Sequence, residues 1–570
     1  MCGIAGIAGE NVSQIRQNIK ILVKNINHRG PDDSGIFINQ KGNVALGNTR
    51  LAIQDTSDNG GQPFISFCKR YVIIFNGEIY NFKEIKKTLN QYKFKSNSDT
   101  EVLLNYYIAK GENCLEDLKG FFSFAIWDHK DNKLFCARDK FGIKPFYYFL
   151  KNNIFSFCSE IKPLLKLQTR SSPNINSINS YLTSEYYENI ETTFFNDILK
   201  LKPGNKLIFQ NGKITQKPFW NFYKKYESIK LPAKFKDRQD YFYNQIDKAV
   251  KYSLISDTKI AVAASGGLDS SILYHHIKNN DAKISTLISF KFNNQKYSEE
   301  KYVKKISKKL NFNISYSNIS KDYFFKNIKK SILLHEEPFS GLPLIAYQKC
   351  FEDLKNHKVV LDGSGIDEAH GGYSKYYQNN KICFHNTQDG TSLGDIISNN
   401  LKIKSQNYNH QLKCNFKNKL KTEMFLDLFY IKIPRSLRFR DKISMANSIE
   451  LRPSFLDENL ICSLMKLDNS WHFNNNFGKW FLRKNYEKII GKSIVYRNKQ
   501  QIQTPQREWL RENYDSYFHS KIQKSKLWET NWIDKKKFFN LNNLFLKKKF
   551  NNSFFLWKFI NLHFWYKNNF

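Results

Sequence analysis

The chain has 570 residues, of which 41% are hydrophobic and 15% aromatic. The length predicts two or more domains, and the composition supports a large core while excluding collagen-like and disordered classes. No stretch approaches about 18 uninterrupted apolar residues, so we expect no membrane span. The N-terminus lacks a basic leader with a cleavage site, which predicts a cytoplasmic protein.

The formal net charge of +37 raises the question of a nucleic-acid partner. The lysines are spread along the whole chain, and no compact basic arm or recognition motif occurs. We therefore predict that they form generic solvated surface and that nucleic acid is not a partner. The nine cysteines are scattered, without a CxxC pair or Cys/His ligand spacing, which predicts reduced thiols rather than disulfides or a zinc site.

Residues 1–210 are rich in short alternating segments punctuated by Gly and Asn, such as GNVALGNTRLAI and RYVIIFNGEIYNF. These segments predict strands and hairpins, with helical patterns between them at 83–91 and 99–110. The first domain is therefore predicted to be a strand-rich α+β domain. Residues 211–240 lose this periodicity and predict a linker.

From residue 241 to 515 strands alternate with helices, which is the pattern of a parallel, doubly wound α/β sheet. The predicted strands cover 259–265, 283–292, 313–319 and 357–365. Residues 400–490 have a mainly helical pattern, and we expect them to add helices to this sheet. The tail, 516–570, is rich in Lys, Asn and aromatic residues but contains no motif, so its role stays open.

The opening segment MCGIAGI places a cysteine directly after the initiator methionine. Methionine removal needs a small second residue, and cysteine qualifies. A mature Cys2 carries a thiol and an α-amine of unperturbed pKa about 8 on one residue, so the amine can act as base for the thiol. Taken alone, a cysteine at this position is more often incidental.

Six further segments occur in one order along the first domain. They are HRGPDDSG (28–35), NTRLAIQD (48–55), FNGEIYN (75–81), SNSDTEVLL (96–104), GFFSFAIWD (120–128) and ARDKFGIKPFYY (137–148). Together with MCGIAGI they resemble the class II glutamine amidotransferases, which are glutaminases of the N-terminal nucleophile type. The resemblance implies an αββα sandwich for residues 1–210.

The same resemblance implies a role for each matching residue. Cys2 attacks the side-chain amide of glutamine, and the Asn76 side chain and Gly77 backbone N–H form the oxyanion hole. Asp99, with Glu78 nearby, holds the α-ammonium of glutamine. A forked pair from Arg50 to the glutamine carboxylate completes the clamp, and the neighbouring residues implied at the glutamine site are Leu51, Ala52, Ile53 and Gln54. Without this context, Asn76 and Gly77 predict a hairpin turn, and Arg50 predicts a surface ion pair.

The segment AASGGLDSS (263–271) lies between a predicted strand and a predicted helix. Its glycines open backbone N–H groups toward a phosphate, and the helix N-terminus favours the anion. Asp269 can hold Mg²⁺ against the phosphates. The segment is not a Walker loop but matches SGGxDS, the pyrophosphate loop of N-type ATP pyrophosphatases. The alternative is a plain strand-to-helix turn.

A glutaminase followed by this loop resembles the asparagine synthetase family of the glutamine-hydrolysing type. Six more segments carry the resemblance, which covers about residues 1–515. They are ISFKF (288–292), HEEPFSG (335–341), GSGIDEAHGGY (363–373), RDKISMANSIELRPSFLD (440–457) and GKWFLR with YRNKQQIQTP (478–483 and 496–505). The fourth differs from the family signature at Ser454, which separates Pro453 from Phe455.

The resemblance implies an ATP-pyrophosphatase domain with ATP and Mg²⁺ as cofactors. ATP adenylates a carboxylate, and ammonia from the first site displaces AMP to form the amide. Asp269 and Asp367 hold Mg²⁺, Lys499 contacts the pyrophosphate, and a dry apolar channel at the domain interface carries ammonia. Assembly as a homodimer is left open. The implied ATP-binding residues are Ala264, Ser265, Gly266, Gly267, Asp269, Ser270, Phe292, Asp362 and Gly363.

The second phosphate loop departs from the family pattern S-G-E-G-S-D-E. Here the loop begins with Asp362, and Ser364 replaces the glutamate that lies beside the acyl-adenylate in the family. The lysine loop also reads QQIQTP. Aspartate is therefore one predicted acceptor, and another carboxylate, such as a sugar acid of surface polysaccharide, is the alternative. A non-catalytic, basic anion- or nucleic-acid-binding protein is a third reading.

Overall fold

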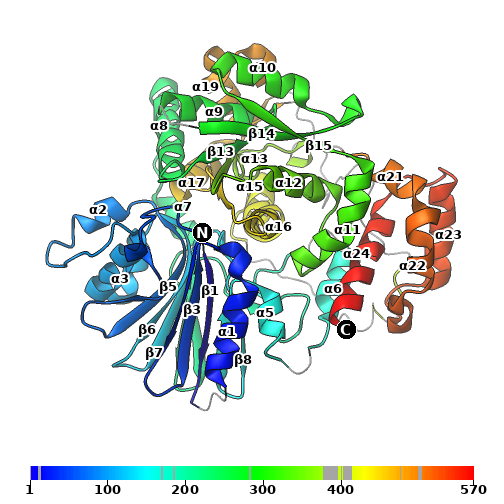
Figure 1. Ribbon diagram of the computed structural model, residues 1–570. Helices are drawn as coiled ribbons and strands as arrows, with labels where there is room; N and C mark the ends of the chain where they lie inside the picture. The colour runs from blue at the N-terminus through cyan, green and yellow to red at the C-terminus, as the bar shows by residue number, and fades with distance from the viewer. Residues whose placement is uncertain are drawn as a thin grey trace.

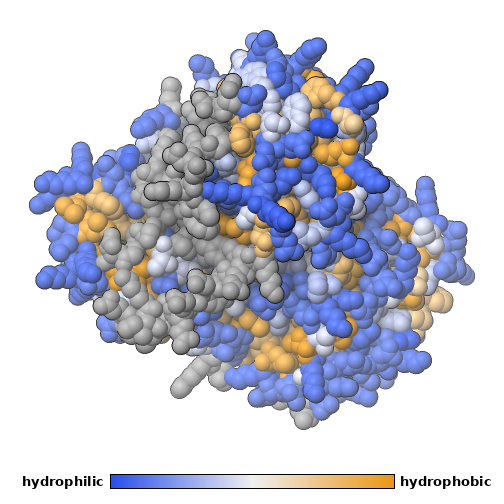
Figure 2. Space-filling view, turned by 180° about the vertical axis from the view of Figure 1, so that it is seen from behind, coloured by the Kyte–Doolittle hydropathy of each residue, from blue (hydrophilic) through white to orange (hydrophobic). Residues whose placement is uncertain are grey.

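The computed structural model describes residues 2–10, 14–168, 171–183, 187–280, 284–376, 396–398, 401, 414–474, 477–497 and 504–570. It has a strand-rich N-terminal half and a C-terminal half in which helices surround a smaller sheet (Figure 1). Among the described residues, no helix is long and apolar enough to cross a membrane. The face in Figure 2 is mostly hydrophilic with scattered apolar areas, as a charge spread along the chain predicts.

The N-terminal half contains two six-stranded antiparallel sheets. The first has the order β10-β8-β9-β1-β3-β2, and its strands are Leu199–Lys200, Tyr147–Lys151, Ile154–Cys158, Gly3–Ala8, Val44–Arg50 and Asp33–Ile38. The second has the order β12-β11-β7-β6-β5-β4, and its strands are Lys213–Pro218, Asn205–Gln210, Lys133–Arg138, Gly120–Asp128, Tyr71–Ile79 and Phe64–Ile65. The helices of this half are α1 (Ile15–Asn25), α2 (Phe82–Lys86), α3 (Asp99–Lys110), α4 (Cys114–Asp117), α5 (Ile161–Leu165) and α6 (Ile175–Thr183).

Alternation along the strands explains how the two sheets stack. In β1, Ile4 points to the core between the sheets, whereas Ala5 and Ile7 point to the outer core shared with α1. On the outer face of the second sheet, α3 packs in the same way. The result is the layer order α-β-β-α, which confirms the predicted sandwich.

The C-terminal half contains a five-stranded parallel sheet of order β15-β14-β13-β16-β17. Its strands are β13 (Ile260–Ala263), β14 (Ile284–Phe292), β15 (Ile314–Ile319), β16 (Val359–Asp362) and β17 (Glu450–Pro453). The strand order reverses between β13 and β16, and ligands of open α/β sheets bind in the crevice at such a point. The doubly wound fold is confirmed.

Helices cover both faces of this sheet (Figure 1). One face packs on α8 (Phe235–Ser253), α9 (Leu268–Asn279), α17 (Glu458–Lys466) and α19 (Trp480–Ile490). The other packs on α11 (Lys321–His335), α12 (Leu342–Asp353) and α16 (Lys432–Met445). Further helices are α10 (Glu300–Leu310), α13 (Ile366–Ala369), α15 (Lys419–Leu426), α18 (Asn469–His472), α20 (Lys492–Val495) and α21 (Gln506–Glu512).

Two segments are more ordered than their sequences suggested. Residues 211–240, predicted as a linker, contain β12, α7 (Phe222–Ser228) and the start of α8, and β12 forms the outer strand of the second sheet. The tail forms α22 (His519–Gln523), α23 (Lys535–Leu546) and α24 (Phe554–Asn569). The buried indoles of Trp557 and Trp565 donate to the carbonyls of Phe339 and Glu336 at 3.1 and 2.9 Å. The tail therefore supports the HEEPFSG turn.

Candidate functional site

Cys2 lies immediately before β1, at one end of the two stacked sheets. Its backbone N–H donates to Asn76 Oδ1 at 3.1 Å, which joins it to β5 of the facing sheet. Burial raises the pKa of the Cys2 thiol, while the charged N-terminus and the hydrogen bond from the Leu51 backbone act in the opposite direction. The two strands thus place the thiol beside the predicted oxyanion donors.

Asn76 and Gly77 have the free donor and the close backbone approach that an oxyanion hole needs. Within the described part of the chain, Asn76 Nδ2 is buried and has no hydrogen-bond partner. A Cβ on Gly77 would lie 2.1 Å from the Phe121 carbonyl oxygen, so only glycine fits between β5 and β6. A buried donor without a partner costs free energy unless a ligand uses it.

The remaining predicted glutamine-binding residues surround this point. The Gln54 amide donates to the Glu78 carboxylate, and Asp99 accepts from the Ile79 N–H at 2.8 Å. Burial raises the pKa of both the Glu78 and the Asp99 carboxyl groups. The Arg50 guanidinium, by contrast, is bonded to backbone carbonyls of its own loop, at Ser57 and Asp55. The loop residues Leu51, Ala52 and Ile53 are buried.

A fully buried arginine joins this site to the other half of the protein. Arg29 forms a bidentate pair with Asp441 of α16 at 2.9 and 3.0 Å, and a further bond of 3.0 Å to Glu160. Its Nε lies 3.5 Å from the Cys2 carbonyl oxygen. Burial alone would lower the pKa of Arg29, but the Asp441 and Glu160 carboxylates raise it. Two carboxylates hold this guanidinium charged.

A second buried pair crosses the interface beside Glu78. Arg452 of β17 lies 3.4 Å from the Glu78 carboxylate and bonds to Glu450 and to the Ser253 carbonyl. The described interface therefore contains buried ion pairs beside its apolar contacts, and the apolar ammonia channel stays a prediction. Buried charges are tolerated there because each meets an opposite charge or a carbonyl. Apolar contacts, such as Leu51 and Phe141 in one core with Phe425, accompany the pairs.

Replacing Arg29 by methionine should destabilise the protein strongly. The change leaves Asp441 and Glu160 buried without their guanidinium, and breaking a buried pair costs about 3–5 kcal/mol. Denaturant unfolding measures the loss. The matched control is Arg70→Met, because Arg70 also pairs with a carboxylate, Asp128, but is partly exposed, so its loss should destabilise the protein much less. Equal losses for both variants would contradict the interface role of Arg29.

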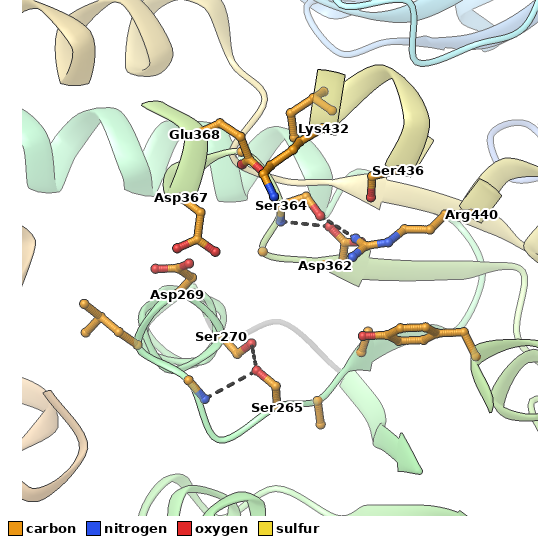
Figure 3. Close-up of a pocket in the computed structure, with 18 of the residues that line it drawn as sticks. Ser265, Asp269, Ser270, Asp362, Ser364, Asp367, Glu368, Lys432, Ser436 and Arg440 are labelled. Carbon is orange, nitrogen blue, oxygen red and sulfur yellow. Dashed lines mark hydrogen bonds and ion pairs between the residues drawn. The ribbon is translucent and has the colours of Figure 1, made fainter. Parts of the chain in front are cut away.

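The second site is a cavity of about 420 Å³ between the carboxyl ends of β13 and β16 (Figure 3). The SGGLDSS loop forms one wall. Ser265 Oγ and Ser270 Oγ lie 2.7 Å apart, and the Gly267 N–H donates to Ser265 Oγ at 3.3 Å. Helix α9 begins at the next residue, so its N-terminus faces the cavity. Ala264 also lines the cavity, whereas Gly266 does not and accepts a bond from Arg497.

Asp269 and Asp367 face each other across the cavity, as the predicted metal site requires (Figure 3). Lys479 Nζ lies 2.8 Å from a carboxylate oxygen of each residue. Burial alone would lower the pKa of Lys479, but the two carboxylates raise it. Two carboxylates with phosphate oxygens suit Mg²⁺, so these residues fit the implied ion. No larger cluster of metal-binding side chains occurs among the described residues.

Lys479 is a candidate functional residue that the sequence interpretation missed. The sequence signal for Lys479 was its place in the segment GKWFLR. In the structure it directly precedes α19 and adopts a left-handed conformation with φ 57°. Phe292, predicted at the ATP site, is buried against Trp509 and is not among the residues that line this cavity. Lys499 lies outside the described residues. Asp362, Gly363 and Ser364 line the cavity as predicted.

Helix α16 supplies a further wall that the sequence did not reveal. Lys432, Ser436 and Arg440 are spaced four residues apart, so they share one face of α16, and all line the cavity. The Arg440 guanidinium bonds to the Asp362 carboxylate and to the Ser364 hydroxyl. Asp441, the next residue of α16, points the other way to Arg29. One helix thus contacts both candidate sites.

The fold and these two sites define a two-domain protein with an N-terminal cysteine site and a phosphate-loop site. A family model described as glutamine amidotransferase domain matches residues 1–220, and one described as asparagine synthase matches residues 242–567. The chain therefore belongs to the asparagine synthase family. The second match includes most of the tail, beyond the region that the sequence resemblance covered.

Among curated proteins, asparagine synthetase [glutamine-hydrolyzing] 1 of Bacillus subtilis is 28% identical over 92% of this chain and 90% of its own length. Asparagine synthetase [glutamine-hydrolyzing] 3 of the same organism is 28% identical over 92% of both. A solved glutamine phosphoribosylpyrophosphate amidotransferase from B. subtilis matches with a TM-score of 0.30 and 15% identity, covering 64% of this chain and 75% of that chain. That likeness carries no further conclusion.

Proposed function

We propose that this protein transfers the amide nitrogen of glutamine to a carboxylate that ATP has activated. The observation that carries the proposal is the placement of α16. One face of this helix lines the phosphate-loop cavity, and its Asp441 pairs with Arg29 beside Cys2. Two sites joined by one rigid helix suit a reaction that makes ammonia at one site and uses it at the other.

In the first half-reaction, the Cys2 thiol attacks the side-chain carbonyl of glutamine. The mature α-amine accepts the thiol proton. Asn76 Nδ2 and the Gly77 N–H then donate to the oxyanion, and each such donor contributes about 3–4 kcal/mol to the transition state. The protonated N-terminal amine gives the proton to the amide nitrogen, the C–N bond breaks and ammonia leaves, and water hydrolyses the remaining thioester to glutamate. Asp99 and Glu78 attract the α-ammonium, and Arg50 must exchange its bonds to backbone carbonyls for the substrate carboxylate.

In the second half-reaction, the acceptor carboxylate attacks the α-phosphate of ATP and pyrophosphate leaves. Backbone N–H groups of the SGGLDSS loop and the Ser265 and Ser270 hydroxyls hold phosphate oxygens. Asp269 and Asp367 would hold Mg²⁺, which supplies positive charge to the phosphates. Lys479 lies between these carboxylates and would neutralise the departing pyrophosphate. Ammonia then displaces AMP.

Two acceptors are candidates within this function. The names of the relatives point to aspartate, with asparagine as the product. The second candidate is a carboxylate other than aspartate. The specific observation in its favour is that Arg440 forms an ion pair with Asp362 and a hydrogen bond to Ser364 in the same loop. A cytoplasmic location, a homodimer and the absence of a nucleic-acid partner remain predictions.

Pyrophosphate release tests the proposed function. The protein is incubated with ATP, Mg²⁺ and glutamine, with and without aspartate, and products are identified by mass. Aspartate-dependent pyrophosphate together with asparagine would establish aspartate as acceptor. Glutamine hydrolysis without aspartate-dependent pyrophosphate would point to another carboxylate. Absence of glutamine hydrolysis would contradict the assignment of the first site.

Glutamine binding should tighten as pH rises through the pKa of Asp99. Burial raises the pKa of this carboxyl group, so it is neutral at low pH and can pair with an α-ammonium only after losing its proton. Calorimetry on the Cys2→Ala variant between about pH 5 and pH 8 isolates this titration from that of the thiol. The Asp99→Asn control should bind weakly with a flatter pH profile. If Asp99→Asn left the pH profile of glutamine binding unchanged, Asp99 would be excluded as the titrating group.

A further inference from the structure

The charged side chains that line the cavity differ in how they are paired. Every carboxylate in the described lining already has a hydrogen-bond donor from the protein. These carboxylates are Asp269, Glu299, Asp362, Asp367 and Glu368. Their donors, in the same order, are Lys479, Arg497, Arg440, Lys479 and Tyr373.

Lys432, by contrast, is a charged residue of the lining to which no oppositely charged group is bonded among the described residues. In Figure 3 its side chain extends from α16 in the direction of Ser364, and its ammonium lies 4.2 Å from the centre of the Tyr373 ring. No ion pair of Lys432 occurs among the described residues. Burial lowers the pKa of this ammonium. The nearby Asp427 carboxylate is bonded instead to Lys375 at 2.7 Å and to the Tyr376 hydroxyl.

Asp362 is the carboxylate next to the Ser364 position, and two protein groups already hold it. One oxygen accepts from the Ser364 N–H at 2.9 Å, and the other pairs with Arg440. Arg440 also holds the Ser364 hydroxyl, so it covers the loop position where the family pattern has glutamate. An ammonium at this point would face the Arg440 guanidinium and the Lys432 ammonium, and like charges in a partly desolvated site disfavour binding.

We propose that the acceptor is a hydroxylated carboxylic acid without an ammonium group, and that Arg440 selects for it by occupying Asp362. The inference rests on the proposed function. Lys432 and Arg440 provide positive charge for an anionic acceptor, and the cavity-lining hydroxyls of Ser340 and Ser436 suit acceptor hydroxyls. With Asp362 paired to Arg440, the ammonium of an α-amino acid would lack this carboxylate as its partner, and an unpaired buried charge is strongly disfavoured.

Three acceptors test this selection directly. L-Malate differs from L-aspartate by a hydroxyl in place of the ammonium, and D-galacturonate carries the same chemistry on a sugar ring. Pyrophosphate release is measured for each with ATP, Mg²⁺ and ammonium chloride, so that the result does not depend on glutamine hydrolysis. We expect kcat/KM for malate or galacturonate to exceed that for aspartate on the order of tenfold or more. The better of the two shows whether the acceptor is a small dicarboxylate or a sugar acid.

The Arg440→Met variant should reverse the preference. Without the guanidinium, Asp362 can pair with the aspartate ammonium, so the ratio of kcat/KM for the ammonium-free acid over aspartate should fall on the order of tenfold. Adding Asp362→Asn should cancel that fall, because the freed carboxylate is removed. A purely structural role of Arg440 would lower all three acceptors together and leave the ratio unchanged. The control is Arg70→Met, an arginine with a similar ion pair in the other half.

Several outcomes would overturn the proposal. They are a wild-type preference for aspartate, an unchanged ratio in Arg440→Met, and no pyrophosphate from any of the three acceptors. Glutamine hydrolysis by each variant reports independently that the protein is folded, because it occurs at Cys2. Failure of the proposed function is distinguished by calorimetry, since it would also abolish binding of ATP with Mg²⁺ to the wild-type protein.

Discussion

The Cys2→Ala variant should lose glutamine-dependent amide formation and keep the reaction driven by ammonia. Alanine removes the thiol that we propose as the nucleophile, and loss of the nucleophile of a hydrolase can cost on the order of 10⁶ in kcat. The phosphate-loop cavity lies in the other half of the protein and contains no atom of Cys2. Rates of pyrophosphate release with glutamine and with ammonium chloride measure the two activities separately.

The matched control for this variant is Cys136→Ala. Cys136 is also buried, but it lies in β7 among Leu134, Phe155 and other apolar residues. Its replacement should leave glutamine hydrolysis intact. If Cys2→Ala lost the ammonia-driven reaction as well, the separation into two sites would be wrong. If it retained glutamine hydrolysis, another nucleophile would have to be sought.

The Asp269→Asn variant should reduce pyrophosphate release about 10²–10³-fold, a loss typical of removing one group that stabilises transition-state charge. The change removes a charge that would hold Mg²⁺ and that now holds Lys479 at 2.8 Å. Asparagine keeps the size of the side chain, so the loop should keep its shape. Glutamine hydrolysis at Cys2 should be retained, and this retention shows that the variant is folded.

Asp322→Asn is the matched control, because Asp322 also lies in the first turn of a helix but is exposed on α11. It should leave both activities unchanged. Raising the Mg²⁺ concentration should partly restore Asp269→Asn, because a weakened cation site fills at higher concentration. An unaffected pyrophosphate rate in Asp269→Asn would show that the reaction does not use this loop.

Much of the fold could be predicted because its signals are local. Alternation of apolar residues predicted the strands of the first domain, and the strand-helix rhythm after residue 241 predicted the parallel sheet. The hydrophobic periodicity of residues 211–240 and of the tail was too weak to predict the elements that these segments form. Strand β12 pairs with its neighbour β11 across a short turn, whereas the tail is held by distant partners, such as Trp557 by the Phe339 carbonyl 218 residues away.

Within the candidate sites, the sequence by itself determined the residues that act as members of short motifs. Cys2 precedes a strand, Asn76 and Gly77 are adjacent, and Ser265, Gly267 and Asp269 follow one strand in a single turn. Such motifs are visible because the chemistry needs neighbouring residues with a set backbone shape, and a few positions of sequence encode that shape.

Only the tertiary structure decided which charges meet. Arg29 and Asp441 are 412 residues apart, Lys479 and Asp269 are 210 apart, and Arg440 and Asp362 are 78 apart. No local pattern specifies such pairs, because the partner is set by how helices pack on the sheets. Burial then decides how much the protein loses when one member of such a pair is removed, because a charge that leaves water is tolerated only beside its partner. The proposed acceptor preference therefore depends on the ion pair between Arg440 of α16 and Asp362 of β16 rather than on the loop sequence alone.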